Sequence, residues 1–85
     1  MPIYLAVVER TRTGFGASFP DVPGCTSAAA SIEHLPAMCL EALEGHLSDQ
    51  EAPTPSPFEK VLAEAREYLA EGAFLLAVPW ERATA

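Results

Sequence analysis

The stretch Phe19-Pro20-Asp21-Val22-Pro23-Gly24-Cys25 decides how this chain folds. Its two prolines fix the backbone φ angle and remove two N–H donors, so the stretch cannot continue a regular strand. Asp21 and Gly24 supply the chemistry of tight turns. We therefore expect a sharp turn here, with Phe19, Pro20, Pro23, Gly24 and Cys25 serving mainly to shape it.

Two strands are expected before this turn. The segment from Ile3 to Glu9 is rich in β-branched and aromatic residues, and residues 15–19 form a second short apolar run. The polar segment between them contains Gly14, which favours an antiparallel hairpin. Gly16 lies inside the second run and indicates a bulge or a close backbone approach.

After the turn we expect a weak third strand at residues 25–27 and then a helix. Ser31 is a good N-cap. An apolar stripe at spacings of three and four follows: Ile32, Leu35, Cys39, Ala42, Leu43 and Leu47. Pro36 interrupts the first backbone bonds of such a helix, so the helix either kinks there or begins near Leu35.

The proline-punctuated residues 48–57 predict a loop. Ser56 followed by Pro57 is typical of an N-cap with proline at the first helical position. Phe58, Leu62, Ala65 and Leu69 then mark one face of a second helix, with Val61 and Tyr68 close to that face, and Gly72 ends the helix. Residues 73–80 are almost entirely apolar, which favours a final strand that is central or covered on both faces.

The predicted order is therefore β-β-β-α-α-β. Strands in hairpins followed by helices and one returning strand indicate the α+β class, with a small, mostly antiparallel sheet and the helices on one face. The 85 residues suffice for one domain, which we place at residues 1–85. A domain of this size has a thin core, so a homo-oligomer is expected.

The charge is strongly acidic: twelve Asp and Glu residues against five Lys and Arg give a formal net charge of -7. A protein that grips nucleic acid directly needs a basic face, so we expect no such binding from this chain. The acidic surface favours a basic partner, or it serves only to keep the protein soluble.

Targeting signals are not visible in the sequence. The chain opens without the basic and apolar regions of a signal peptide, and no apolar run approaches the roughly 20 residues that span a membrane. Two cysteines do not form a disulfide framework. We expect a cytoplasmic protein with reduced thiols and no membrane association.

The sequence contains no pattern typical of a catalytic, metal or cofactor site, and we expect none. A catalytic Cys25 would need a histidine as base, and His34 and His46 lie twelve residues apart, about 18 Å along a straight helix. The spacing of Cys25, His34, Cys39 and His46 does not match that of zinc ligands. The acids do not cluster on the strands as a magnesium-dependent nuclease would require. We expect no enzyme activity.

The sequence resembles the N-terminal domain of the HicB family of antitoxins. The resemblance rests on residues 4–9, on the hairpin and turn of residues 15–25 with its Phe-Pro-Asp-Val-Pro-Gly-Cys pattern, and on the helix after Ser31. Residues 55–57 and 74–79 also fit the later pattern of the family. Two segments depart from it: Ala29-Ala30-Ser31 stands where Gly-Asp-Thr/Ser is usual, and Glu33-His34-Leu35 where Glu-Glu-Ala is usual.

This resemblance implies a shortened RNase H-like fold without catalytic acids. It also implies a partner, a small basic mRNA-cleaving toxin of the HicA type, which the chain would bind and mask. The DNA-binding segment of many family members is expected to be absent after residue 85. The alternatives are a stand-alone homo-oligomeric module for another ligand and a residual metal-dependent nuclease. For contact with a partner we expect the exposed part of the turn, Asp21 and Val22.

Overall fold

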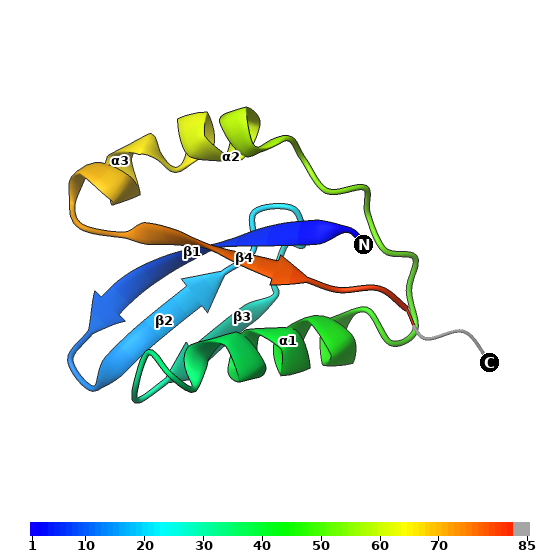
Figure 1. Ribbon diagram of the computed structural model, residues 1–85, viewed down its shortest axis with the longest axis horizontal. Coiled ribbons are helices and arrows are strands. Elements are labelled where there is room, and N and C mark those ends of the chain that lie inside the picture. Colours follow the sequence, from blue (N-terminus) through cyan, green and yellow to red (C-terminus); the bar gives the residue numbers. More distant parts are fainter. Residues whose placement is uncertain (83–85) are drawn as a thin grey trace.

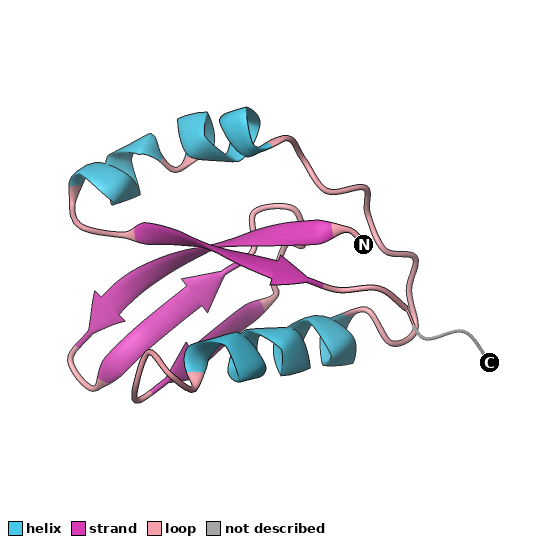
Figure 2. Cartoon of the chain, viewed as in Figure 1, coloured by secondary structure: helices cyan, strands magenta, loops and turns pink. Residues whose placement is uncertain are grey.

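A computed structural model describes residues 1–82 of the chain. Its seven elements follow in the order β1 (Ile3–Thr11), β2 (Gly14–Ser18), β3 (Thr26–Ala29), α1 (Leu35–His46), α2 (Phe58–Glu64), α3 (Arg66–Ala70) and β4 (Phe74–Pro79). The strands form one antiparallel sheet of order β3-β2-β1-β4. The sheet lies between α1 and the α2–α3 pair (Figures 1 and 2). The predicted α+β class and antiparallel sheet are confirmed; the RNase H-like relation stays a prediction.

The β1–β2 hairpin is confirmed, and its glycine is explained by a close approach. A Cβ atom on Gly14 would lie 2.3 Å from the carbonyl oxygen of Ala29 at the end of β3, so only glycine fits. The expectation for Gly16 is wrong. Gly16 pairs in regular register with Glu9, and a Cβ there would make an ordinary 3.5 Å contact with Thr11 Cγ2.

The main core lies between α1 and one face of the sheet. Successive strand residues point to opposite faces, so Tyr4, Ala6 and Val8 of β1 share this face. All three are buried. The apolar side of α1 covers them and is buried to 1% exposure or less at Leu35, Cys39, Leu43 and, just after the helix, Leu47. The predicted stripe is confirmed at these four positions, whereas Ile32 is 52% exposed and precedes the helix.

The start of α1 decides between the two possibilities that Pro36 left open, a kinked helix and a helix that begins near Leu35. The helix begins at Leu35, which places Pro36 in its first turn, where the missing N–H would have had no partner within the helix. Ser31 does not cap the helix, and its hydroxyl oxygen lies 2.7 Å from His34 Nδ1 instead. The predicted N-cap at Ser31 is therefore wrong.

The second helical segment lies on the opposite face of the sheet, so the placement of both helices on one face is wrong. Val7 points to this face and is buried, and a crevice that it lines is also lined by Ala65 and Tyr68. Figure 1 shows α1 and the α2–α3 pair on opposite sides of the strands. The reason lies in β1: Val7 is apolar like Ala6 and Val8 but points to the other face, so that face also needs a helical layer to bury it.

The second helix is also interrupted. At Ala65, with φ -92° and ψ 3°, α2 ends and α3 begins. The buried positions are Ala65, which confirms the predicted face there, and Val61, which was expected close to that face. The prediction is wrong for Phe58 and Leu62, which are 53% and 40% exposed. The cap is Pro57 rather than Ser56.

Strand β4 is an edge strand and not a central one. It pairs with β1 in antiparallel register from Ile3↔Pro79 to Val8↔Phe74, and within residues 1–82 no strand pairs with its other side. Val78 is its only buried residue; residues 74–76 are partly covered, and Ala77 and Pro79 are exposed. None of the helices in residues 1–82 has the length and apolar character needed to cross a membrane.

Candidate functional site

The Phe19–Cys25 turn consists of two consecutive tight turns. The amide of Val22 donates to the carbonyl oxygen of Phe19 (3.1 Å), and the amide of Cys25 donates to that of Val22 (3.0 Å). In the second turn Pro23 occupies the second position and Gly24, at φ 86°, the third, which is the sequence preference of a type II turn. The amide of Phe19 also donates to the carbonyl oxygen of Cys25, which closes the base of the turn. The predicted architecture of this turn is confirmed.

Asp21 links this turn to the segment that precedes α2. Its carboxylate accepts hydrogen bonds from the backbone amide of Ser56 (2.7 Å) and from the Ser56 hydroxyl (2.6 Å). Both bonds are partly buried, and a carboxylate acceptor makes such bonds stronger than neutral ones. The pair joins residues 35 positions apart in sequence and so anchors the proline loop, residues 48–57, to the sheet.

Two further bonds anchor the proline loop. The Tyr4 hydroxyl, at the start of β1, donates to the carbonyl oxygen of Pro53 (2.6 Å), and Arg82 donates to that of Gln50 (2.6 Å). Burial of the phenol, with a smaller effect from the nearby charge of Asp21, raises the pKa of Tyr4 above its usual value of 10.0. The phenol therefore remains a hydrogen-bond donor under neutral conditions.

The two residues predicted to touch a partner are less available than expected. Val22 is only 3% exposed and packs in the main core, so the expectation that it lies on the surface is wrong. Asp21 is half-buried and uses both carboxylate oxygens on Ser56. Its contact with a partner stays a prediction. Pro20, Pro23 and Gly24 are exposed, and Phe19 and Cys25 are buried.

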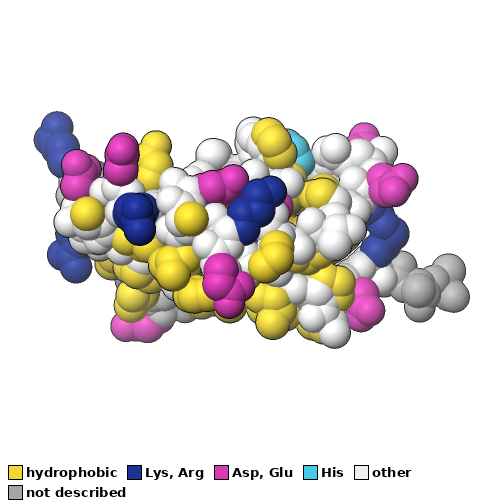
Figure 3. All heavy atoms as spheres, turned by 90° about the horizontal axis from the view of Figure 1, so that it is seen from above, with side chains coloured by type: hydrophobic (Ala, Val, Ile, Leu, Met, Phe, Trp, Pro, Cys, Tyr) yellow, Lys and Arg dark blue, Asp and Glu magenta, His cyan; other side chains and the backbone are white. Residues whose placement is uncertain are grey.

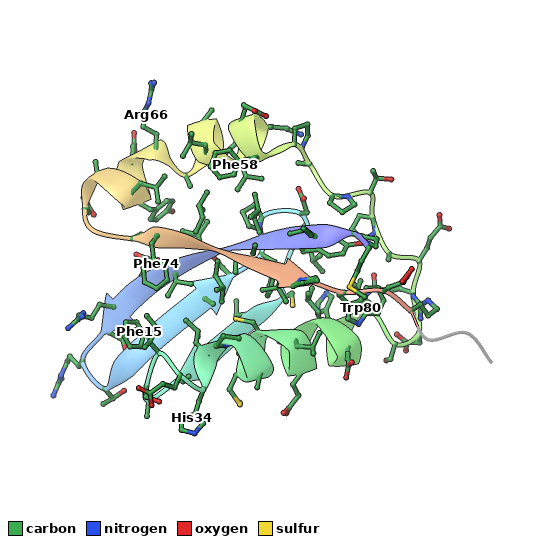
Figure 4. The ribbon with its side chains drawn as sticks, in the orientation of Figure 1. Phe15, His34, Phe58, Arg66, Phe74 and Trp80 are labelled. Atoms are coloured by element: carbon green, nitrogen blue, oxygen red, sulfur yellow. The ribbon has the colours of Figure 1, made fainter. Side chains whose placement is uncertain are left out.

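The cysteines have the environment of core residues. Cys25 and Cys39 are both free and buried, and burial raises the pKa of each thiol above its usual value of 9.0. A nucleophilic cysteine needs the opposite shift, toward the thiolate. His34 is exposed, as Figure 4 shows, on the outer side of the molecule below α1. This arrangement provides no activated thiol.

A small crevice lies between the sheet and the α2–α3 pair. Its volume is about 230 Å³, and it is lined by Val7, Glu9, Ser18, Pro20, Glu64, Ala65 and Tyr68. Within residues 1–82 no group of three or more His, Cys, Asp or Glu side chains is close enough to bind a metal.

The charged residues divide between the two helical layers. Residues 13–59, which include β3, α1 and the proline loop, contain seven acids and no Lys or Arg. On α1 these acids are Glu41 and Glu44, both exposed. The α2–α3 side instead mixes both signs, with Lys60 and Arg66 among its glutamates, and Figure 3 shows dark blue and magenta side chains together on that side. The charged side chains of helix α1 are therefore all negative, and the guanidinium of Arg82 lies on the loop after it, where it donates to Ser48 and Gln50.

Comparison with known protein families shows to which family this chain belongs. The family described as HicB-like antitoxin of bacterial toxin-antitoxin system matches residues 1–81. The chain belongs to this family. The resemblance drawn from the Phe19–Cys25 turn is thereby confirmed over nearly the whole HicB-like chain.

Individual relatives agree with this assignment. The crystal structure of the antitoxin HicB3 superposes with a TM-score of 0.78 at 25% identity, over 93% of this HicB-like chain and 62% of HicB3. A chain in the HicA3 and HicB3 toxin-antitoxin complex has the same fold, with a TM-score of 0.75 at 24% identity over 94% and 99% of the two chains.

A sequence relative comes from Haemophilus phage HP1 (strain HP1c1), an uncharacterized 14.9 kDa protein of the rep-hol intergenic region. It is 31% identical over 65 residues, which are 71% of this chain and 49% of the phage protein. The chain thus spans about half of the phage protein and 62% of HicB3.

Sequence reasoning missed the residues that anchor the proline loop. Ser56 was assigned to a helix cap, and Tyr4 was assigned only to a strand, yet both hold the loop from a distance. The sequence gives a partial signal for two of these residues. Ser56 lies between two prolines and Asp21 follows one, and a polar side chain in such a segment needs a hydrogen-bond partner when it is buried. Tyr4 gave no comparable signal.

Proposed function

We propose that this chain is an antitoxin domain that binds and masks a small, basic, mRNA-cleaving toxin of the HicA type. The observation that carries the proposal is the family match over residues 1–81. On this proposal the chain performs no catalysis itself. The toxin acts on RNA, and the domain acts on the toxin by covering its surface.

The charge distribution supports the proposal independently of the family. A protein that binds RNA displays a basic face, and an inhibitor of that face gains from a negative one. Helix α1, whose charged side chains are the exposed Glu41 and Glu44, has this character. A surface on which acids predominate attracts a basic partner over a longer range than a surface with both signs in equal number does. We therefore propose the α1 layer as the side that first meets the toxin.

The test is a binding experiment with a purified toxin of the HicA type. We expect a stable complex, and we expect the association rate to fall about tenfold between low and high salt as screening removes the attraction. Changing Glu41→Gln together with Glu44→Gln is expected to slow association about three- to tenfold at low salt, with a smaller effect on dissociation.

A matched control separates position from total charge. The pair Glu67→Gln and Glu71→Gln removes the same two charges from exposed sites at and just after α3, in the layer where signs are mixed. We expect this variant to associate at nearly the wild-type rate. Absence of any complex with the toxin contradicts the proposed function, whereas equal slowing by both variants contradicts only the choice of the α1 layer.

A further inference from the structure

The crevice between the sheet and the α2–α3 pair has an acid on each of its two sides. Glu9 belongs to the sheet side, since it lies two residues after Val7 on β1 and shares its face. Glu64, the last residue of α2, belongs to the helical side. The described residues that line this space include no Lys or Arg. Two like charges across one crevice repel each other, and a cation placed between them is attracted to both.

The basic side chains nearest to these acids in sequence are directed elsewhere. The guanidinium of Arg10 lies over the ring of Phe15, 5.5 Å from its centre, and Phe15 packs against the main core on the other face of the sheet. Arg66 projects away from the sheet (Figure 4). Lys60, one helical turn before Glu64, does not line the crevice. These three cations therefore leave the negative charge inside the crevice without a partner.

The rest of the crevice suits the apolar stem of a long cationic side chain. Val7 and Ala65 are 6% and 2% exposed and give it an apolar interior. Tyr68 adds an aromatic ring that is 52% exposed, and its carbonyl oxygen accepts from the amides of Glu71 and Ala73, at 3.0 Å each, which fixes the end of α3. Arginine and lysine lay their methylene groups along apolar surface. A guanidinium is also attracted to the face of a tyrosine ring.

We propose that this crevice binds the side chain of an arginine presented by a protein partner. The guanidinium lies between the carboxylates of Glu9 and Glu64, beside the ring of Tyr68. Its methylene stem contacts Val7 and Ala65. A cavity of roughly 150 Å³ holds one benzene molecule, so the volume of about 230 Å³ suits one such side chain and not a folded segment. Arginine is favoured over lysine because its planar fork donates to two carboxylates and stacks on a ring at the same time.

Charge complementarity decides the nature of this occupant. An apolar or acidic side chain would cover the two carboxylates without pairing them, which costs free energy. The sheet lies between the crevice and α1 (Figure 1), so a toxin bound to the α1 layer leaves the crevice open. The occupant is therefore a further protein with an exposed arginine. This inference does not depend on the proposed toxin partnership.

The experiment titrates short blocked peptides into the isotope-labelled chain and follows its backbone amides by NMR. With acetyl-Gly-Arg-Gly-amide we expect saturable shifts centred on Val7, Ala65 and Tyr68, and a dissociation constant on the order of 1–10 mM. Citrulline in place of arginine keeps the shape without the charge and should bind at least about fivefold more weakly. Lysine should bind about two- to fivefold more weakly than arginine. A leucine peptide should give no saturable shift.

Two variants locate the recognition within the crevice. Glu9→Gln together with Glu64→Gln keeps the size of both side chains and should weaken arginine binding by about five- to tenfold. Tyr68→Leu removes the ring and should weaken it by about two- to fivefold. Glu41→Gln together with Glu44→Gln is the matched control, because it removes the same two charges on the other side of the sheet and should bind the arginine peptide like the wild type. Circular dichroism verifies that each variant is folded.

Any of four results would overturn the inference. The first is the absence of saturable shifts up to about 50 mM arginine peptide. The second is equal or tighter binding of the citrulline or leucine peptide, which shows that the crevice does not recognise charge. The third is equal weakening by the two pairs of Gln substitutions, which reduces the effect to net charge. The fourth is displacement of the arginine peptide by a purified toxin of the HicA type, which assigns the crevice to the toxin instead.

Discussion

The two helical layers cover the same sheet but are held to it in different ways. On one face, α1 and the residue after it bury Leu35, Cys39, Leu43 and Leu47 almost completely. On the other face, α2 and α3 with the residue between them bury only Val61 and Ala65. The α1 layer is therefore fixed by its apolar core. The α2–α3 layer depends more on how its preceding loop is anchored.

The layers also differ in charge. The α1 layer belongs to a stretch of residues 13–59 without a single Lys or Arg, and the α2–α3 side mixes signs. Arg66 projects from that side, away from the sheet (Figure 4). One layer thus combines the stability of the fold with the negative surface proposed for the toxin. A partner that binds the α1 layer meets a rigid surface, which lowers the entropy lost on binding.

The largest expected effect tests the difference in core packing. Leu43→Ala removes a side chain with 0% exposure from the α1 core, and we expect it to lower the free energy of unfolding by about 2–5 kcal/mol. Val61→Ala in the other layer removes two methyl groups at 1% exposure and should lower it by about 1–2 kcal/mol. Urea denaturation measures both. Equal losses, or a larger loss from Val61→Ala, would contradict the distinction.

The next effect tests how the α2–α3 layer is anchored. Asp21→Asn weakens the two hydrogen bonds to Ser56, and we expect a loss of about 1–3 kcal/mol in the free energy of unfolding. Hydrogen exchange should increase in α2 and α3 more than in α1. Asp49→Asn makes the same chemical change at an exposed site and should alter stability by less than about 0.5 kcal/mol. If hydrogen exchange became faster by the same factor in both layers, the prediction that Asp21 specifically anchors the α2–α3 layer would be contradicted.

The smallest effect is a loss of stability in alkali. Burial raises the pKa of Cys25 and Cys39 above 9.0 and that of Tyr4 above 10.0. Each folded-state pKa exceeds the unfolded one, so the stabilising contribution is complete below the unfolded-state value and is lost as pH rises through the folded-state value. The urea midpoint should hold from neutrality to about pH 9 and then fall, first with the thiols and then with the phenol. An unchanged midpoint up to about pH 11 would contradict the burial of these groups.

Local patterns made the α1 side of the fold predictable. The stripe at Leu35, Cys39, Leu43 and Leu47 has helical spacing, and the Phe19–Cys25 turn contains the residues that two tight turns require. Proline is tolerated in the first turn of a helix, so Pro36 favours a helix that begins near Leu35. These features depend on residues near one another in sequence. They can therefore be predicted from this sequence without knowledge of its tertiary contacts.

The α2–α3 side was harder to predict because its structure depends on distant partners. Phe58 and Leu62 have the same helical spacing to Ala65 and Leu69 that an inward face requires, yet it is Val61 that is buried beside Ala65. A pattern without tertiary contacts does not distinguish these positions. The bonds from Asp21 to Ser56 and from Tyr4 to Pro53 join residues 35 and 49 positions apart. The edge position of β4 likewise follows from the whole sheet order and not from its own apolar sequence.

The most direct test of the proposed function is an RNA-cleavage assay with a purified toxin of the HicA type. The toxin alone is expected to cleave mRNA, and addition of the purified chain in equal amount is expected to stop cleavage. The Glu41→Gln and Glu44→Gln variant should protect more slowly than the Glu67→Gln and Glu71→Gln control. Cleavage that continues undiminished in an excess of folded chain would contradict the account.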